Sequence, residues 1–78
     1  MSKAEKIITR MRQNPHGDWR IDQLKAIASR HGIEWRHYGT SHVFFIAPNG
    51  ERLTVPAHKT ISPVYVKMFV DMIEKIKE

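Results

Sequence analysis

The chain has 78 residues and no cysteine, and its 13 lysines and arginines against 8 acidic residues give it a formal net charge of +5. A chain of this length forms one domain with a small core, and the lack of cysteine excludes disulfides, thiolate metal ligands and a cysteine nucleophile. The first six residues lack the apolar segment of a signal peptide, and no apolar run reaches the roughly 18 residues that span a bilayer. We therefore expect residues 1–78 to form one cytoplasmic domain.

The positive charge is concentrated in one part of the chain. Residues 1–60 contain ten lysines and arginines and five acidic residues, whereas residues 61–78 contain three of each. A basic surplus on a small domain suits a nucleic-acid partner, because each neutralised phosphate releases counterions. Basic side chains also serve solubility alone, so the charge leaves both interpretations open.

The first segment has the periodicity of a helix. Apolar residues recur at helical spacing from Ala4 to Met11, after a capping box formed by Ser2 and Glu5. The Asn-Pro-His-Gly segment at 14–17 stops this pattern, because proline cannot continue the hydrogen-bond ladder. We expect a first helix that ends at about residue 13.

A second helix is expected to follow the Asn-Pro-His-Gly segment. Asp18 is a candidate for its N-cap, and Gly32 supplies the left-handed position after its last turn, where Arg30 and His31 favour the helix dipole. The residues expected on its buried face are Ile21, Leu24, Ile27 and Ala28.

The period then changes from that of a helix to that of strands. Residues 33–38 alternate apolar and polar side chains and predict a strand that is half covered by the core. A turn at 39–41 leads into residues 42–47, which are rich in β-branched and aromatic side chains and predict the central strand. The Asn-Gly pair within 48–51 is typical of a hairpin, and residues 52–55 predict a third strand that ends at a proline.

A last helix begins at Ser62-Pro63, because serine caps helices and proline is favoured at the first helical position. The expected order is therefore α-α-β-β-β-α, an α+β domain in which a three-stranded antiparallel sheet has helices on one face and solvent or a partner on the other. The residues expected on the buried face of the last helix are Val66, Phe69, Val70, Ile73 and Ile76.

The aromatic residues of the strands allow two interpretations. Trp35, Tyr38, Phe44 and Phe45 resemble sheet aromatics that stack on unpaired bases, but they also suit a core. Phe44 and Phe45 are adjacent and face opposite ways, so one of them is exposed or covered by a partner. We expect Trp35 to pack in the core, and the apolar character of both strand faces predicts a protein partner on the sheet or its edge.

His42 follows the glycine-containing turn at the start of the expected central strand. An imidazole exchanges protons near neutral pH, and one held by a rigid sheet yet reachable from its edge suits a general acid or base. In RNA such a base takes the proton of a 2′-hydroxyl, whose oxygen attacks the adjacent phosphorus, while cations stabilise the phosphorane. The alternative is a structural histidine that binds a backbone carbonyl at the strand edge.

His58 and Lys59 follow the third strand. If the second and third strands pair through the Asn-Gly turn, the end of the third lies near the start of the second, so His58 and Lys59 are expected near His42. They would supply a second acid and a cation for RNA cleavage. The alternative is that His58 only fixes the loop into the last helix.

The three remaining histidines are less informative. His16 is expected in a loop, His31 in the last turn of a helix and His37 on the first strand. No histidine spacing matches a zinc-ligand pattern, and the acidic residues are scattered rather than clustered as in two-metal nucleases. We therefore expect no metal site and no cofactor.

Two histidine-containing motifs are joined here by the expected hairpin. The first is Gly39-Thr40-Ser41-His42, and the second runs from Pro48-Asn49-Gly50-Glu51 to Thr54-Val55-Pro56-Ala57-His58. Together with a helix that ends at Gly32 and a helix after the second motif, they resemble the HicA family of toxin–antitoxin systems, in the order that family shows. The resemblance extends from Gly32 to the end of the chain and includes the helix before it.

The resemblance implies a double-stranded-RNA-binding-like fold over about residues 18–78, with residues 1–15 as an additional helix that we expect to cover the core. It also implies cleavage of mRNA without a metal, and neutralisation by a HicB-type antitoxin protein. His42 would be the catalytic residue, Gly39 and Thr40 would shape its turn, and His58 would belong to the second motif. Thr40 departs from the family, in which serine is usual at this position.

Three hypotheses follow from the sequence. In the first, the protein is an RNA endonuclease in which His42 is the general acid or base, His58 is a second such group, and Lys59, Arg52 and Arg36 hold phosphates. In the second it is a non-catalytic RNA-binding module of the same fold. In the third it is a protein-interaction domain whose RNA affinity is incidental to its charge. None of them involves a membrane.

Overall fold

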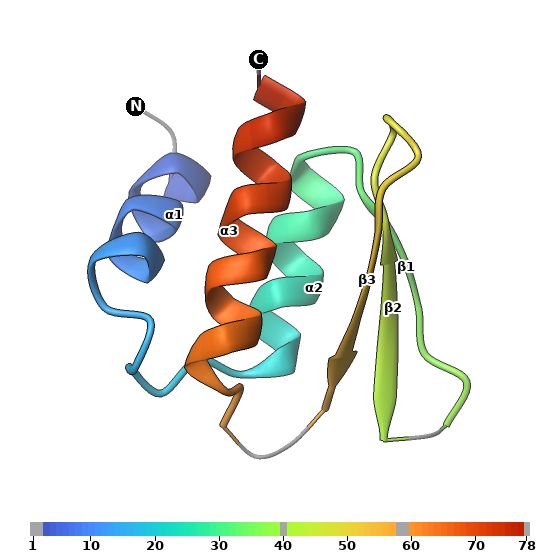
Figure 1. The fold of residues 1–78 in the computed structure, drawn as a ribbon, viewed down its shortest axis with the longest axis horizontal. Coiled ribbons are helices and arrows are strands. Elements are labelled where there is room, and N and C mark those ends of the chain that lie inside the picture. The colour runs from blue at the N-terminus through green and yellow to red at the C-terminus, as the bar shows by residue number, and fades with distance from the viewer. Residues whose placement is uncertain (1–2, 40, 58–59, 78) are drawn as a thin grey trace.

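The computed structural model describes residues 3–39, 41–57 and 60–77. Its elements follow the order expected from the sequence, and all three helices lie on one side of a three-stranded sheet (Figure 1). The protein is therefore an α+β domain with an open sheet face. In chain order the elements are α1 (Lys3–Gln13), α2 (Ile21–Arg30), β1 (Glu34–Arg36), β2 (His42–Ile46), β3 (Arg52–Pro56) and α3 (Pro63–Lys77).

The sheet is antiparallel, with β2 in the centre as predicted. The turn between β2 and β3 is closed by hydrogen bonds from the Ala47 N–H to the Glu51 carbonyl and from the Gly50 N–H to the Ala47 carbonyl, at 2.8 and 3.0 Å. Gly50 has a φ of 91°, which a residue without a Cβ adopts at little cost. The Asn49 side chain accepts a hydrogen bond from the Glu51 N–H at 3.0 Å, so the turn consists of the three residues 48–50 and sets Ile46 opposite Arg52.

The core lies between the helices and one face of the sheet. Val43 and Phe45 on β2 are fully buried, as is Val55 on β3. The ring of Phe45 packs against that of Phe69 on α3, with 5.2 Å between centroids. The buried residues of α2 and α3 are mostly those predicted, namely Leu24, Ile27 and Ala28 on α2 and Val66, Phe69, Val70, Met72 and Ile73 on α3.

The first helix, α1, packs against α3, which lies between α1 and the sheet (Figure 1). Ile8 and Met11 are buried in the same core as the sheet residues, and Arg12 forms an ion pair with Glu74 of α3. The helix therefore covers core, as expected, while Ser2 of its predicted capping box lies outside the described residues.

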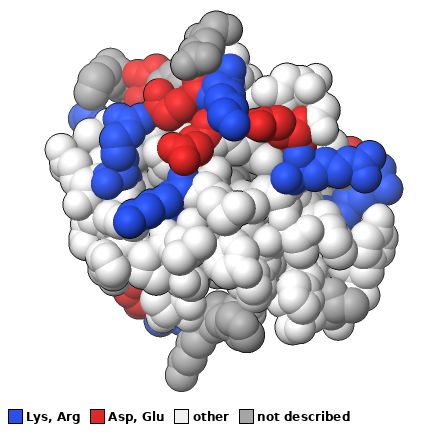
Figure 2. All heavy atoms as spheres, viewed as in Figure 1, with Lys and Arg blue, Asp and Glu red and all other residues white. Residues whose placement is uncertain are grey.

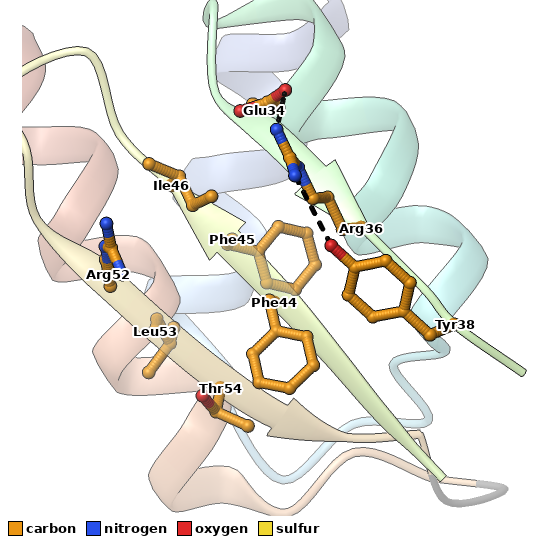
Figure 3. Close-up of a pocket in the computed structure, with 9 residues that line it drawn as sticks. All are labelled: Glu34, Arg36, Tyr38, Phe44, Phe45, Ile46, Arg52, Leu53 and Thr54. Carbon is orange, nitrogen blue, oxygen red and sulfur yellow. Dashed lines mark hydrogen bonds and ion pairs between the residues drawn. The ribbon is translucent and has the colours of Figure 1, made fainter. Parts of the chain in front are cut away.

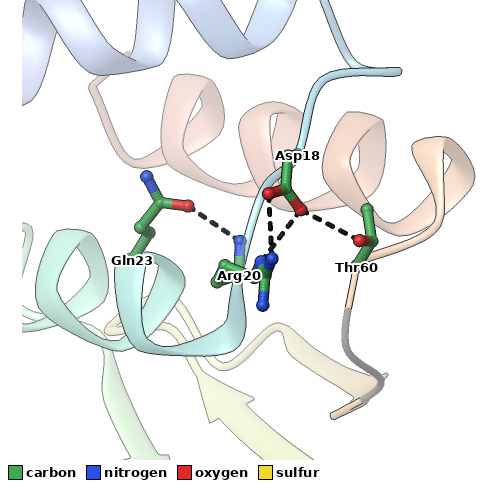
Figure 4. A network of polar contacts seen from close by, with 4 residues as sticks. All are labelled: Asp18, Arg20, Gln23 and Thr60. Carbon is green, nitrogen blue, oxygen red and sulfur yellow. Dashed lines mark hydrogen bonds and ion pairs between the residues drawn. The ribbon is translucent and has the colours of Figure 1, made fainter.

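The two ends of α2 agree only in part with the sequence prediction. At its C-terminus Gly32 has a φ of 72°, and the Ile33 N–H donates to the Ala28 carbonyl at 2.9 Å, which is a Schellman motif. At its N-terminus the prediction for Asp18 was wrong. The cap residue is Arg20, which is extended and whose N–H donates to the side chain of Gln23 at 2.8 Å (Figure 4), because the helix begins only at Ile21.

The predictions for the first strand were also partly wrong. β1 is shorter than the expected strand over 33–38, and Trp35 is 37% exposed rather than in the core. Trp35 lies on an edge strand, where its ring meets polar residues of α2. The Lys25 ammonium lies 4.7 Å from the ring centroid, a cation–π contact, and the indole N–H donates to the Ser29 hydroxyl at 3.2 Å.

Because α1 contributes fully buried side chains, truncating one should destabilise the whole domain. We expect Met11→Ala to lower the free energy of unfolding by about 2–5 kcal/mol, since it leaves a cavity in the core. The control is Lys6→Ala on the same helix, an exposed position, where we expect a change within about 0.5 kcal/mol. Denaturant unfolding followed by circular dichroism measures both, and equal stabilities would contradict a core role for α1.

Candidate nucleic-acid interface

His42 is the first residue of the central strand and lies opposite Pro56 on β3. Its side chain is exposed. Side chains alternate along a strand, and Val43 and Phe45 face the core, so His42 and Phe44 face away from the helices. The Ser41 hydroxyl lies 3.5 Å from Nδ1 of the imidazole. His42 is thus at one end of the open sheet face, held by strand pairing and accessible from outside.

The pairing of β2 with β3 continues past the strand end. The Ala57 N–H donates to the Ser41 carbonyl at 2.6 Å, so the chain that leaves β3 begins its next segment beside His42. The predicted proximity of the end of β3 to the start of β2 is therefore confirmed. His58 and Lys59 lie outside the described residues, so their predicted nearness to His42 stays a prediction.

The turn before His42 is described at Gly39 and Ser41. Gly39 has a φ of 74°, and a Cβ there would meet no atom within 4 Å. The turn therefore needs glycine for its backbone conformation rather than for space. Thr40, the other predicted turn residue, lies outside the described residues.

The segment after Lys59 is held to the connection between α1 and α2. The Asp18 carboxylate accepts hydrogen bonds from the Thr60 hydroxyl at 2.9 Å and from the Arg20 guanidinium at 2.8 and 2.9 Å (Figure 4). The Ile61 N–H donates to the Trp19 carbonyl at 2.8 Å. The described residues on either side of His58 and Lys59 are therefore both anchored, one to β2 and the other to this connection.

The open face of the sheet is arranged in rows that cross the strands. One row consists of Arg36, Phe44 and Thr54, and the next consists of Glu34, Ile46 and Arg52. Successive rows on one face are two residues apart, about 6.6–6.8 Å. Arg36 is thus one row from His42, whereas Arg52 is two rows away. The register brings Arg36 toward His42 and does not bring Arg52 there.

A shallow depression occupies this face (Figure 3). The rings of Tyr38 and Phe44 form one side of it, with 6.1 Å between centroids and an interplanar angle of 52°. Both rings are accessible, Tyr38 being 66% exposed and Phe44 37%. The lining residues are Glu34, Arg36, Tyr38, Phe44, Phe45, Ile46, Arg52, Leu53 and Thr54.

The Arg36 guanidinium is held in place within the depression. It donates to the Tyr38 hydroxyl at 3.4 Å and to the Glu34 carboxylate at 3.1 Å. The hydrogen bond to Tyr38, followed by that to Glu34, raises the pKa of Arg36 above its ordinary value. Arg36 is therefore a fixed positive charge beside two accessible aromatic rings.

The sequence singled out most residues of this face but did not predict which of them are neighbours. The prediction that one of Phe44 and Phe45 is exposed is confirmed, and the exposed one is Phe44. Glu34 and Thr54 were not anticipated as neighbours of the aromatic pair. Counting outward from a two-residue Asn-Gly turn would have placed Val55 opposite Phe44, whereas the observed three-residue turn at 48–50 places Thr54 there.

The charge on the side of the molecule seen in Figure 1 is mixed. Figure 2 shows basic and acidic side chains interleaved toward the end where both termini lie, with uncharged surface below them. Two of the ion pairs are Arg12 with Glu74 and Lys75 with Glu51. Among the described residues, the side seen in this view therefore presents no continuous basic patch for a phosphate backbone.

Two further histidines have their own contacts. His31 approaches the Ile27 carbonyl through Nδ1 at 2.9 Å, near the end of α2 as predicted. His37 was expected on the first strand, but β1 ends at Arg36, and the His37 ring nitrogen lies 3.0 Å from the Lys25 ammonium. Within residues 3–39, 41–57 and 60–77, no three metal-ligating side chains gather at one place. None of the helices in that part of the chain has the length and apolar character to cross a bilayer.

No family model, no curated protein and no solved structure matches this chain. The structural indication of function is therefore the open sheet face, with His42 at its end.

The contacts of Asp18 make a measurable prediction. The hydrogen bonds from Arg20 and then Thr60 lower the pKa of Asp18 below 3.8, because they stabilise the charged carboxylate. We expect a carbon-13 NMR titration to place the Asp18 midpoint below that value, and Arg20→Ala to move it up toward the ordinary range. Lys67→Ala, an exposed change on α3, serves as the control. An identical midpoint with and without Arg20 would show that the pair does not form in solution.

Proposed function

We propose that this protein is a metal-independent endoribonuclease of the HicA type that cleaves mRNA, with His42 as its general acid or base. The observation that carries the proposal is the position of His42, exposed at the end of an open sheet face that also presents a fixed guanidinium and two aromatic rings. Resemblance in the two histidine motifs supports the same assignment. The proposal includes a double-stranded-RNA-binding-like fold and a cytoplasmic location.

The proposed reaction uses the 2′-hydroxyl of the RNA itself as the nucleophile. His42 takes the proton of this hydroxyl, and its oxygen forms a bond to the adjacent phosphorus. The bond from phosphorus to the 5′-oxygen then breaks, and an acid protonates the departing oxygen. The products are a 2′,3′-cyclic phosphate and a 5′-hydroxyl, so the reaction consumes no water and needs no external nucleophile.

Further groups assist this reaction in the proposal. His58 is the candidate for the acid that protonates the 5′-oxygen, and Lys59 is a candidate for stabilising the phosphorane, where negative charge accumulates. Arg36, one row from His42, suits a phosphate next to the cleaved one. Arg52, two rows away, suits a phosphate further along the strand.

The proposed biological role is that of the toxin in a toxin–antitoxin pair. A HicB-type antitoxin protein encoded alongside would neutralise the nuclease. The motif resemblance supports this role, and the open sheet face offers such a partner an accessible surface around His42.

The decisive experiment is cleavage of a defined unstructured RNA by the purified protein in excess EDTA. We expect the wild type to cleave and His42→Ala to lose about 10²–10⁴-fold in rate, the range for removal of a general acid or base, with RNA affinity unchanged within a few-fold. His37→Ala is the matched control, because His37 is also an exposed histidine and is expected to retain activity. Cleavage by His42→Ala at the wild-type rate would overturn the assignment.

A non-catalytic RNA-binding module is the second candidate, favoured by the aromatic and cationic groups of the sheet face. If it holds, neither the wild type nor His42→Ala cleaves RNA. In either case we expect Arg36→Ala to weaken RNA binding and to reduce the slope of log affinity against log salt by about 1, because one phosphate contact is lost. Lys67→Ala on α3 should leave the slope unchanged, and equal slopes for both variants would exclude a phosphate contact by Arg36.

A further inference from the structure

Phe44 occupies an unusual position for a phenylalanine. It lies on the central strand, yet it is 37% exposed, because the described helices cover the opposite face of the sheet. An exposed apolar ring at the centre of a sheet is not explained by packing within the domain. Its surroundings on the open face are therefore informative about what it binds.

The neighbours of Phe44 combine a flat apolar surface with polar groups. Tyr38 stands beside it at a tilted angle, and Thr54 lies opposite it on β3 (Figure 3). Arg36, opposite Phe44 on β1, donates one hydrogen bond each from Nη1 and Nη2 to its described partners. A guanidinium has five N–H donors, so donors remain for a further acceptor such as a phosphate.

The charge and shape of this surface favour RNA over an apolar protein segment. Two guanidinium groups, those of Arg36 and Arg52, border the depression, and Glu34, the one acidic residue among those that line it, is already paired to Arg36. A nucleotide joins a flat ring to a negatively charged phosphate, and it complements an aromatic ring flanked by cations. The ring of Phe44 would stack on the base, and Thr54 and Tyr38 offer hydroxyls to its polar edge.

The distance to His42 links this surface to the cleavage site. Phe44 and His42 lie on the same face of one strand, two residues apart, which is about 6.6–6.8 Å. A base stacked on Phe44 would therefore carry a sugar and phosphate within reach of the imidazole. Bases inside a duplex are stacked on each other and are not open to such a contact.

We propose that the open sheet face binds one unpaired base on Phe44 and its phosphate on Arg36, so that the substrate is single-stranded RNA at the cleaved nucleotide. The link to cleavage rests on the function proposed above, whereas the binding of an unpaired base stands without it. Tyr38 limits the space beside the stacked base.

The test uses a single-stranded RNA that contains one 2-aminopurine, whose fluorescence is quenched when it stacks on an aromatic ring. Binding is measured with the His42→Ala protein, so that the RNA stays intact. We expect quenching on binding, and we expect Phe44→Leu in this background to abolish the quenching and weaken binding about 5- to 150-fold, the contribution of one base–aromatic stack. Phe44→Tyr should retain the quenching.

The matched control is Trp35→Leu in the same background. Trp35 has the same exposed fraction as Phe44, 37%, but it faces α2, so this variant should bind and quench like its parent. Thermal unfolding of each variant verifies that it is folded. A fully paired RNA of the same sequence should bind more weakly and without quenching.

The outcomes separate this inference from the proposed nuclease. If Phe44→Leu keeps the parent affinity and quenching, or if duplex RNA binds as tightly as the single strand, the base site is wrong even when the wild type cleaves RNA. If quenching depends on Phe44 but the wild type cleaves nothing, the base site stands and the nuclease proposal fails. Quenching that Trp35→Leu removes instead would place the base against α2 and also overturn the inference.

Discussion

The pairing register between β2 and β3 is the constraint on which the rest of this structure depends. Side chains alternate between the two faces of a strand, so a slip of one residue would exchange the faces. Val43 and Phe45 would then leave the core, and His42 and Phe44 would be buried under the helices. The three-residue turn at 48–50 opposes this slip, because its geometry fixes which residues stand opposite each other. Core and candidate site therefore share one determinant.

The same register gives the open face its chemical order. It places the imidazole in one row and the aromatic ring and the Arg36 guanidinium together in the next, so that a strand of RNA running along β2 would meet the imidazole and then this pair. The strands themselves are held by backbone hydrogen bonds and by the core beneath. A sheet can thus present a reactive group and a binding surface at a fixed spacing, without a deep cleft.

The sequence predicted the order of elements and most of the buried residues, because apolar residues recur with the period of a helix or of a strand. It predicted that one of Phe44 and Phe45 is exposed, because adjacent strand residues alternate. It did not place Trp35, since burial at a sheet edge depends on how far α2 reaches. Nor did it show that Asp18 binds Thr60 instead of capping α2. Contacts between distant segments, such as that of Asp18 with Thr60, leave no local pattern in the sequence. The hydrogen bond between Arg36 and Tyr38 depends on side-chain conformations, which the sequence pattern does not give.

The location of α3 has a consequence for how the protein is made. Among the described elements α3 is synthesised last, yet it lies between α1 and the sheet and contributes Phe69 and Ile73 to the centre of the core. Phe45 of the sheet packs on Phe69, and α1 packs on α3, so neither the sheet nor α1 is fully covered before residues 63–77 have left the ribosome. The chain therefore completes its core only after these residues are translated, and a chain that ends before them lacks every buried side chain that α3 contributes.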